Sequence, residues 1–135
     1  MYFLDTSYIL AIELRNDQNH HRAQLHWQKF RGNLPDILTT TYVFDEIVTF
    51  FNSRDQHKKA IEVGTLLLTS AKITLVHVES SLFQQSWAYF VRHQDKRFSL
   101  TDCVSFVLMR QYQITNVFTF DNHFKQAGFQ MEPGD

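Results

Sequence analysis

The sequence predicts an α/β fold: one domain with a mostly parallel central sheet of four to five strands flanked by helices. Short apolar, β-branched runs alternate along the chain with longer segments whose apolar residues recur at helical spacing. This alternation favours a parallel sheet covered on both faces, with right-handed crossovers. The 135 residues suit one domain, and no linker, repeat or low-complexity segment divides them. We therefore treat residues 1–135 as a single domain.

The first half of the chain contains two strands and four helices in this interpretation. In order, we expect a strand at 2–4, a helix carrying Ile9, Leu10, Ile12 and Leu14, a helix at about 20–30, a strand at 37–39, a helix at 41–53 and a helix at about 56–69. Thr6 or Ser7 is the expected cap of the first helix, because either hydroxyl can accept a hydrogen bond from a free backbone N–H. Glu46 then lies on a helix that follows a strand.

The second half continues the same alternation. We expect a strand at 73–78, a helix capped by Ser80 or Ser81, a helix at 102–112 capped by Thr101, a strand at 116–120, a short helix at about 123–127 and an edge strand at 129–131. Asp102 then lies in the first turn of its helix, and Asp121 follows directly on its strand.

Composition excludes several classes of protein. The formal net charge is −1 and the isoelectric point is near 6.6, whereas nucleic-acid-binding domains are usually strongly basic. A bound polyanion must therefore be held locally, by metal and a few cations. The single cysteine, Cys103, excludes an intramolecular disulfide and a cysteine-rich zinc site. No 18-residue apolar stretch or signal-peptide pattern is present, so we expect a cytoplasmic protein without a membrane partner.

Four acidic residues, Asp5, Glu46, Asp102 and Asp121, are the candidate site. In an open α/β sheet, ligand chemistry gathers beyond the carboxyl ends of the strands, and all four positions fit that rim. Carboxylates packed closely repel one another, so they either take up protons or bind a cation. Oxygen ligands with open coordination positions suit Mg²⁺ or Mn²⁺. Zinc is disfavoured, because the seven His lack an HExxH spacing.

Each of these acids also fits an ordinary structural role. Asp5 could start a helix, Asp102 could favour the helix dipole, and Asp121 could form an Asx turn with the residues after it. Glu46 could be a solvated helix position. The joint pattern favours the metal site, because Glu46 lies among apolar neighbours and Asp102 directly precedes an apolar run.

The segments around the four acids resemble the motifs of the PIN domain family, in particular the VapC-type toxins of bacterial toxin–antitoxin pairs. The resemblance covers essentially the whole chain and rests on four segments in order: Phe3-Leu4-Asp5-Thr6-Ser7, Thr40-Thr41-Tyr42-Val43-Phe44-Asp45-Glu46-Ile47, Ser99-Leu100-Thr101-Asp102-Cys103 and Val117-Phe118-Thr119-Phe120-Asp121-Asn122-His123-Phe124. Each segment is weak evidence alone, whereas the four together at these spacings are a strong signal.

The resemblance implies a magnesium- or manganese-dependent ribonuclease that leaves a 5′-phosphate and a 3′-hydroxyl. Its catalytic and metal-binding residues would be Asp5, Glu46, Asp102 and Asp121, and Thr6 and Thr101 would be supporting hydroxyls. Asp95 matches a frequent further acid of the family, but it also fits an exposed loop. The implied partners are an RNA substrate, a cognate antitoxin and a second copy of the chain in a homodimer.

Two other functions remain open from the sequence. A housekeeping PIN-type nuclease for RNA processing or repair would use the same acids, and an isolated gene without an adjacent antitoxin frame would favour it. A catalytically silent RNA-binding or interaction module would be expected to lack one or more of the acids, all of which are present. Aromatic residues are abundant, with 13 Phe, 5 Tyr and 2 Trp, so some could lie in a two-fold interface. The candidates are Trp27, Phe30, Phe44, Phe50 and Phe51.

Overall fold

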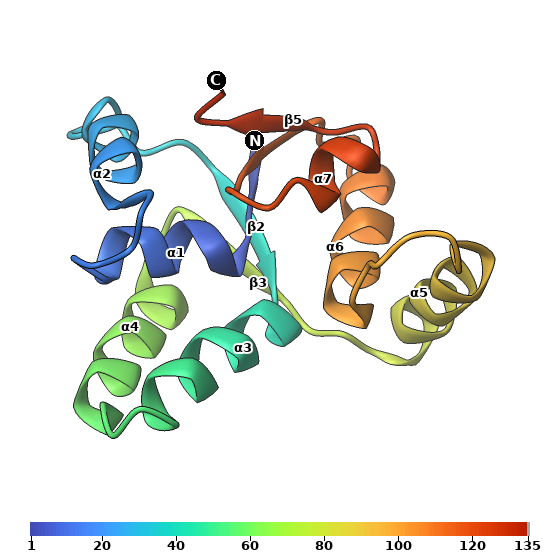
Figure 1. The fold of residues 1–135 in the computed structure, drawn as a ribbon, viewed down its shortest axis with the longest axis horizontal. Coiled ribbons are helices and arrows are strands. Elements are labelled where there is room, and N and C mark those ends of the chain that lie inside the picture. Colours follow the sequence, from blue (N-terminus) through green and yellow to red (C-terminus); the bar gives the residue numbers. More distant parts are fainter. Residues whose placement is uncertain (135) are drawn as a thin grey trace.

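The computed structural model describes residues 1–134 and contains a five-stranded sheet in which every pairing is parallel (Figure 1). The strand order is β3-β2-β1-β4-β5. The strands are β1 (Tyr2–Leu4), β2 (Ile37–Thr40), β3 (Ile73–Val76), β4 (Asn116–Phe118) and β5 (Gln130–Glu132). The predicted fold class is confirmed, and the last predicted strand is the fifth strand at one edge.

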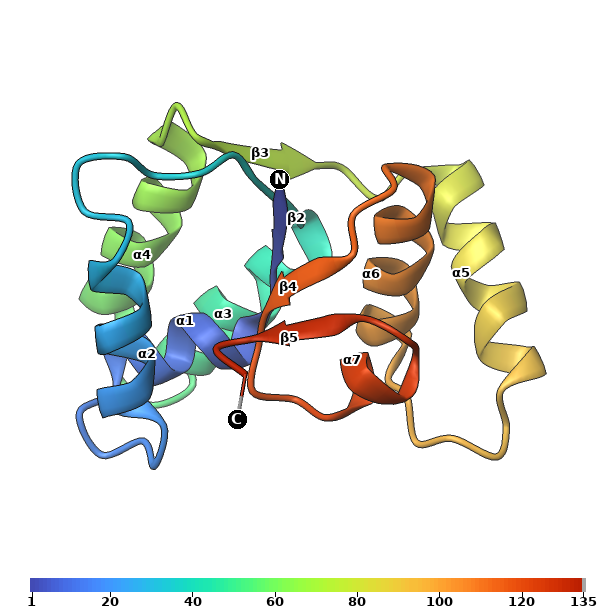
Figure 2. The ribbon, with the colours of Figure 1, turned by 90° about the horizontal axis from the view of Figure 1, so that it is seen from above.

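Helices cover the sheet on both sides (Figure 2). On one side lie α1 (Thr6–Glu13), α2 (His20–Gln28), α3 (Thr41–Asn52) and α4 (His57–Thr69), and on the other lie α5 (Ser80–Arg92), α6 (Leu100–Gln111) and α7 (His123–Gln126). Helix α5 packs on α6 at the periphery, away from the sheet. Within residues 1–134, no helix has the length and apolar character needed to cross a membrane.

The topology determines where a site can form. From β1 the chain moves outward through β2 to β3, and it then returns to place β4 on the other side of β1. The direction of winding therefore reverses between β1 and β4. Loops that follow these two strands diverge to opposite faces of the sheet, and the space between them is where ligands bind in open α/β folds.

The central strands and α6 form the core. Phe3 and Leu4 of β1 are fully buried, as are Val117 and Phe118 of β4. Tyr8 stacks on Phe118 with ring centroids 5.0 Å apart. Burial raises the pKa of the Tyr8 hydroxyl well above its ordinary value. This packing fixes the ends of β1 and β4, and therefore the positions of the residues that follow them.

Three predicted helix caps were wrong, and the first is that of α5, whose N-cap is Glu79 and not Ser80 or Ser81. Helix α1 is capped by Asp5, whose carboxylate accepts a hydrogen bond from the Ser7 N–H, and not by Thr6 or Ser7. Helix α6 starts at Leu100 and is capped by Ser99, two residues before the predicted cap Thr101. Ser99 and Asp102 exchange two hydrogen bonds, so the helix begins where this reciprocal pair can close.

The aromatic residues proposed for an interface are mostly covered. Phe51 is fully buried, while Trp27, Phe30, Phe44 and Phe50 are partly buried against the core. The large exposed aromatic residues are instead on α5 and just after α6: Phe83, Trp87, Phe90 and Tyr112. The sequence pattern could not separate these groups, because both show helical spacing.

Candidate active site

All four predicted acids line one pocket of about 310 Å³. Asp5 directly follows β1, and Asp121 lies three residues after the end of β4. Glu46 comes from the second turn of α3, the helix that follows β2, and Asp102 from the first turn of α6. The pocket therefore lies at the carboxyl end of the sheet, beside the strands where the winding reverses.

Asp5 is the most enclosed of the four, with 5% of its surface exposed. Its Oδ2 atom accepts hydrogen bonds from the Ser7 hydroxyl and the Thr119 hydroxyl, each at 2.7 Å. Burial is the largest influence on this carboxyl and raises its pKa to about 6, against the opposing effect of the two hydroxyls. Repulsion from Asp102 and Asp121 adds to the rise. Asp5 therefore carries an ionised carboxylate at neutral pH that has lost much of its hydration.

Glu46 reaches the pocket from α3, where its side chain is still exposed to solvent. The Thr6 hydroxyl donates a hydrogen bond of 2.6 Å to its Oε1 atom. Partial loss of hydration raises the pKa of Glu46, and the nearby Asp102 carboxylate adds to this effect. Thr6 thus holds the side chain of Glu46 by this hydrogen bond.

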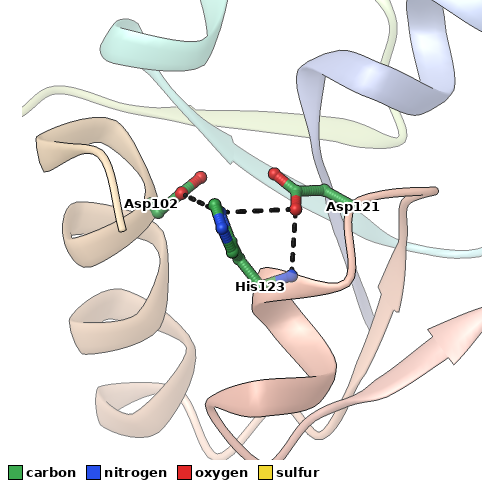
Figure 3. Close-up of side chains that lie close together, drawn as sticks. All are labelled: Asp102, Asp121 and His123. Carbon is green, nitrogen blue, oxygen red and sulfur yellow. Dashed lines mark hydrogen bonds and ion pairs between the residues drawn. The ribbon is translucent and has the colours of Figure 1, made fainter. Parts of the chain in front are cut away.

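Asp102, Asp121 and His123 form the tightest cluster in the pocket (Figure 3). The His123 Nδ1 atom lies 3.1 Å from Asp102 Oδ2 and 3.4 Å from Asp121 Oδ1. The His123 backbone N–H also donates to Asp121 Oδ1 at 2.9 Å. Desolvation raises the pKa of Asp102, whereas the Ser99 N–H and His123 lower it. His123 therefore ties the acid on α6 to the acid after β4.

Several residues of this site cannot be identified from the sequence. In the sequence, His123, Ser99 and Thr119 stand out only as parts of motifs, and Ser7 only as part of a motif and as a possible helix cap. The role of Thr119 arises because it meets Ser7 and Asp5 across 112 and 114 positions of sequence. The one local signal was the position of Ser99, three residues before Asp102, which is the spacing of a capping box.

Two expected residues lie apart from the pocket. Thr101 is on α6, where its carbonyl accepts a hydrogen bond from the Ser105 hydroxyl, and its side chain is not part of the pocket wall. Asp95 is exposed, with its carboxylate 3.9 Å from the Lys96 ammonium. Arg97, from the same loop, does line the pocket and is its one Arg or Lys among the described residues.

The four carboxylates share a feature that suits a divalent cation. In each, the hydrogen bonds from residues 1–134 go to one oxygen only: Asp5 Oδ2, Glu46 Oε1, Asp102 Oδ2 and Asp121 Oδ1. The second oxygen of each therefore accepts no hydrogen bond from these residues, and all four side chains line one pocket. Several acidic oxygens with few competing donors are the ligands that Mg²⁺ and Mn²⁺ prefer. The residues present fit such an ion.

Comparison with known proteins gives consistent results across sequence and structure. The PIN domain family model matches residues 2–130. The chain is 33% identical over 129 residues to the 23S rRNA-specific endonuclease VapC20 of Mycobacterium tuberculosis, covering 96% of this chain and 95% of that protein.

Two solved structures share the fold. The crystal structure of Mycobacterium tuberculosis VapC20, a sarcin–ricin loop cleaving toxin, has a TM-score of 0.86 at 31% identity, with 96% of each chain covered. FitAcB from Neisseria gonorrhoeae has a TM-score of 0.62 at 18% identity, with 97% of this chain and 96% of that chain covered, which supports the fold alone. With an all-parallel sheet and four acids in one pocket at its carboxyl end, this chain belongs to the PIN domain family.

Proposed function

We propose that the chain is a metal-dependent endoribonuclease that acts as the toxin of a toxin–antitoxin pair. The observation that carries this proposal is the convergence of Asp5, Glu46, Asp102 and Asp121 in one pocket, each with an oxygen that accepts no hydrogen bond from residues 1–134. The family membership and the 33% identity to an rRNA endonuclease support the same reaction.

The proposed reaction is hydrolysis of an RNA phosphodiester. Asp5, Asp102 and Asp121 would hold Mg²⁺ or Mn²⁺, and Glu46 would bind it directly or through water. The ion supplies charge neutralisation at the phosphate and an acidified water molecule. Water oxygen forms a bond to phosphorus, and the bond from phosphorus to the 3′ oxygen breaks. The products are a 5′-phosphate and a 3′-hydroxyl.

The side chains around the acids contribute orientation. Ser7 and Thr119 hold one Asp5 oxygen, Thr6 holds one Glu46 oxygen, and His123 joins Asp102 to Asp121. A ligand set fixed in this way loses little entropy when the ion and the phosphate bind. No nucleophilic side chain is required for this reaction.

The substrate we propose is a structured RNA, with the sarcin–ricin stem–loop of 23S rRNA as the first probe. The relative of 33% identity is a 23S rRNA-specific endonuclease, and its solved structure is that of a sarcin–ricin loop cleaving toxin. Cleavage by this chain should require Mg²⁺ or Mn²⁺. An RNA substrate of this kind is consistent with action in the cytoplasm.

Our first prediction concerns this reaction. The purified wild-type chain should cleave the stem–loop with Mg²⁺ or Mn²⁺ and not with EDTA. Asp5→Asn should lower the rate at least 100-fold, because it removes a negative ligand from the enclosed part of the pocket. Asp45→Asn is the matched control: Asp45 is exposed, beside Glu46, and bonds only to Thr49 among the described residues.

Gel analysis of end-labelled RNA provides the measurement, and circular dichroism checks that each variant is folded. An undiminished rate for Asp5→Asn, with contaminating nuclease excluded, would show that the reaction occurs elsewhere. Resistance of every tested RNA to the wild type would reject the nuclease function and favour a silent binding module.

Our second prediction concerns the biological role. Expression of the wild type alone should arrest growth, Asp5→Asn should not, and a co-encoded antitoxin should relieve the arrest by covering the acidic pocket. Colony counts after induction provide the measurement. Equal growth with the two versions, together with cleavage in vitro, would favour a housekeeping PIN-type nuclease for RNA processing or repair.

A homodimer remains part of this proposal, but the surface differs from the one expected from sequence. Phe83, Trp87, Phe90 and Val91 of α5 are 41%, 52%, 39% and 56% exposed. Their spacing places them on one side of the helix, apart from its buried residues Leu82, Ser86 and Tyr89. Pairing of this face with its copy would bury the largest exposed aromatic group of the described residues.

A further inference from the structure

A second pocket lies beside the acidic one and has the opposite charge. It has a volume of about 410 Å³ and is formed by the start of α2, the segment between β4 and α7, and the residues around β5. In Figure 2 the C-terminal end of β5 lies between α2 and the segment that joins β4 to α7. The residues that matter here are Arg22, Phe120, Asn122, Lys125 and Gln130.

The two pockets share a wall. Along the chain from 120 to 123, Phe120 and Asn122 line the second pocket, whereas Asp121 and His123 line the acidic one. This alternation places the two pockets on opposite sides of one short segment. A chain molecule bound across that segment would therefore occupy both.

The lining of the second pocket suits a phosphate and a base. Arg22 and Lys125 line it, and no Asp or Glu among residues 1–134 does so. Arg22 is held in place, because its guanidinium lies 5.4 Å from the centre of the Phe120 ring and donates to the Gly134 carbonyl at 3.0 Å. Lys125 is exposed and makes no ion pair with a described residue.

The remaining polar groups are amides. Asn122 and Gln130 offer both donors and acceptors, which matches the mixed edge of a nucleobase. A guanidinium plane and an aromatic ring are the surfaces on which unpaired RNA bases stack. An acidic pocket repels an RNA backbone until metal is bound, so a cationic pocket next to it would supply the missing attraction.

We infer that this second pocket is a nucleotide subsite, which binds the RNA nucleotide next to the scissile phosphate. In this arrangement Arg22 and Lys125 bind backbone phosphate, and Asn122 with Gln130 contacts the base. The inference rests on the proposed function, because it assumes that the scissile phosphate lies in the acidic pocket. It explains how a chain of net charge −1 holds a polyanion.

The test measures RNA binding and cleavage separately. Fluorescence anisotropy follows a labelled sarcin–ricin stem–loop RNA binding to Asp5→Asn protein with Mg²⁺ present, so that the RNA stays intact. Arg22→Gln with Lys125→Gln should weaken binding at least tenfold. It should also reduce the slope of log Kd against log salt by about 1.4, at about 0.7 for each lost phosphate contact.

Two further variants sharpen the experiment. Lys58→Gln with Lys72→Gln makes the same change in net charge on the exposed lysines of α4 and of the turn that precedes β3. This pair should change Kd less than twofold. Lys125→Arg should retain binding, because a cation remains at the same place. In the otherwise wild-type chain, the double variant of the pocket should raise KM for RNA cleavage and leave kcat within about twofold.

The possible outcomes test the nucleotide subsite and the nuclease function separately. Equal RNA affinity and equal salt slope for the pocket variant and the control would overturn the subsite, as would undetectable RNA binding by the Asp5→Asn protein. Intact RNA with the wild type, despite binding that depends on Arg22 and Lys125, would reject the nuclease function and leave the pocket as an RNA-binding site only. A fall in kcat without a rise in KM would also overturn the assignment.

Discussion

At the scale of single residues, Asp5 is the acid of the candidate site whose surroundings differ most from water. It is almost fully buried, and it lies against hydroxyls that can donate to only one of its oxygens. Burial raises its pKa from 3.8 to about 6, so the folded protein binds a proton here more tightly than the unfolded chain does. A buried carboxylate with a raised pKa is a common property of residues that bind metal or react.

Our third prediction follows from the sign of this shift. Between about pH 4 and about pH 6 the folded state holds a proton that the unfolded state has lost, so the free energy of unfolding falls as pH rises. For Asp5 alone the fall is up to about 3 kcal/mol, at about 1.4 kcal/mol for each pH unit between the two pKa values. Asp5→Asn should remove the contribution of Asp5 to this fall in the free energy of unfolding. The metal-free variant should therefore be more stable than the wild type at pH 7.

Urea unfolding in EDTA at pH 4, 5, 6 and 7 gives the free energy of unfolding of the wild type and of Asp5→Asn. The difference between the two values at each pH measures the contribution of Asp5. The raised pKa values of Glu46 and Asp102 act in the same direction in both proteins, so they largely cancel in that difference. Parallel curves, with a constant gap between the wild type and Asp5→Asn, would contradict the prediction. Mg²⁺ at neutral pH should reduce the difference in free energy of unfolding between the two proteins, because it neutralises the Asp5 carboxylate of the wild type.

At the scale of elements, the start of α6 determines the position of Asp102. The Ser99 hydroxyl accepts from the Asp102 N–H at 3.0 Å, and the Asp102 carboxylate accepts from the Ser99 N–H at 3.0 Å. The same carboxylate lies in the acidic pocket and contacts His123. One residue therefore serves both the helix terminus and the candidate metal site.

Our fourth prediction tests this cap against the one expected from sequence. Ser99→Ala should lower stability by about 1 kcal/mol, because a backbone N–H at the helix start loses its acceptor. For a domain of this size that corresponds to a fall in Tm of about 4 °C. Thr101→Ala is the control and should change Tm by less than half as much, since the Thr101 hydroxyl makes no hydrogen bond to the described residues.

Thermal unfolding followed by circular dichroism measures both variants under identical conditions. An equal loss in the two variants would show that the hydroxyl of Ser99 contributes no more than that of its neighbour in the first turn. A larger fall in Tm for Thr101→Ala than for Ser99→Ala would show that Thr101 is the cap, as the sequence analysis expected.

At the scale of the whole molecule, α5 leaves a large apolar face uncovered. It packs on α6, and its exposed side chains Trp87 and Phe90 stack on each other with ring centroids 5.5 Å apart. Exposed patches of this kind usually mark a place where another chain binds. A two-fold pairing is the simplest arrangement that covers it, because the same patch then serves both copies.

Our fifth prediction is that the chain is a homodimer in solution through this face. Light scattering at micromolar concentration should give about twice the chain mass of 16.0 kDa. Trp87→Glu should shift the mass to that of one chain, because it places a charge in an apolar contact. Leu66→Glu, on the exposed side of α4, makes the same kind of change elsewhere and should leave the dimer intact. A wild-type mass near one chain would reject the dimer.

The sequence determined the order of strands and helices and the positions of the four acids along them. These follow from local chemistry: apolar runs of two different periods, and acids placed just after strands or in the first turns of helices. The parallel sheet was predicted on this basis, and the family was predicted from the resemblance of the four motif segments; both are confirmed. Glu46 was proposed from the sequence because it lies among apolar helix neighbours, and the structure places it in the wall of the acidic pocket.

Tertiary structure decided what the sequence could not. Thr119 meets Asp5 and His123 meets Asp102 only in the folded chain, and there too α2 and the segment after β4 come together around the cationic pocket. These contacts join residues separated by up to 114 positions. Local patterns report which residues can form a helix or a strand, whereas contacts across the sheet depend on how strands are ordered and packed.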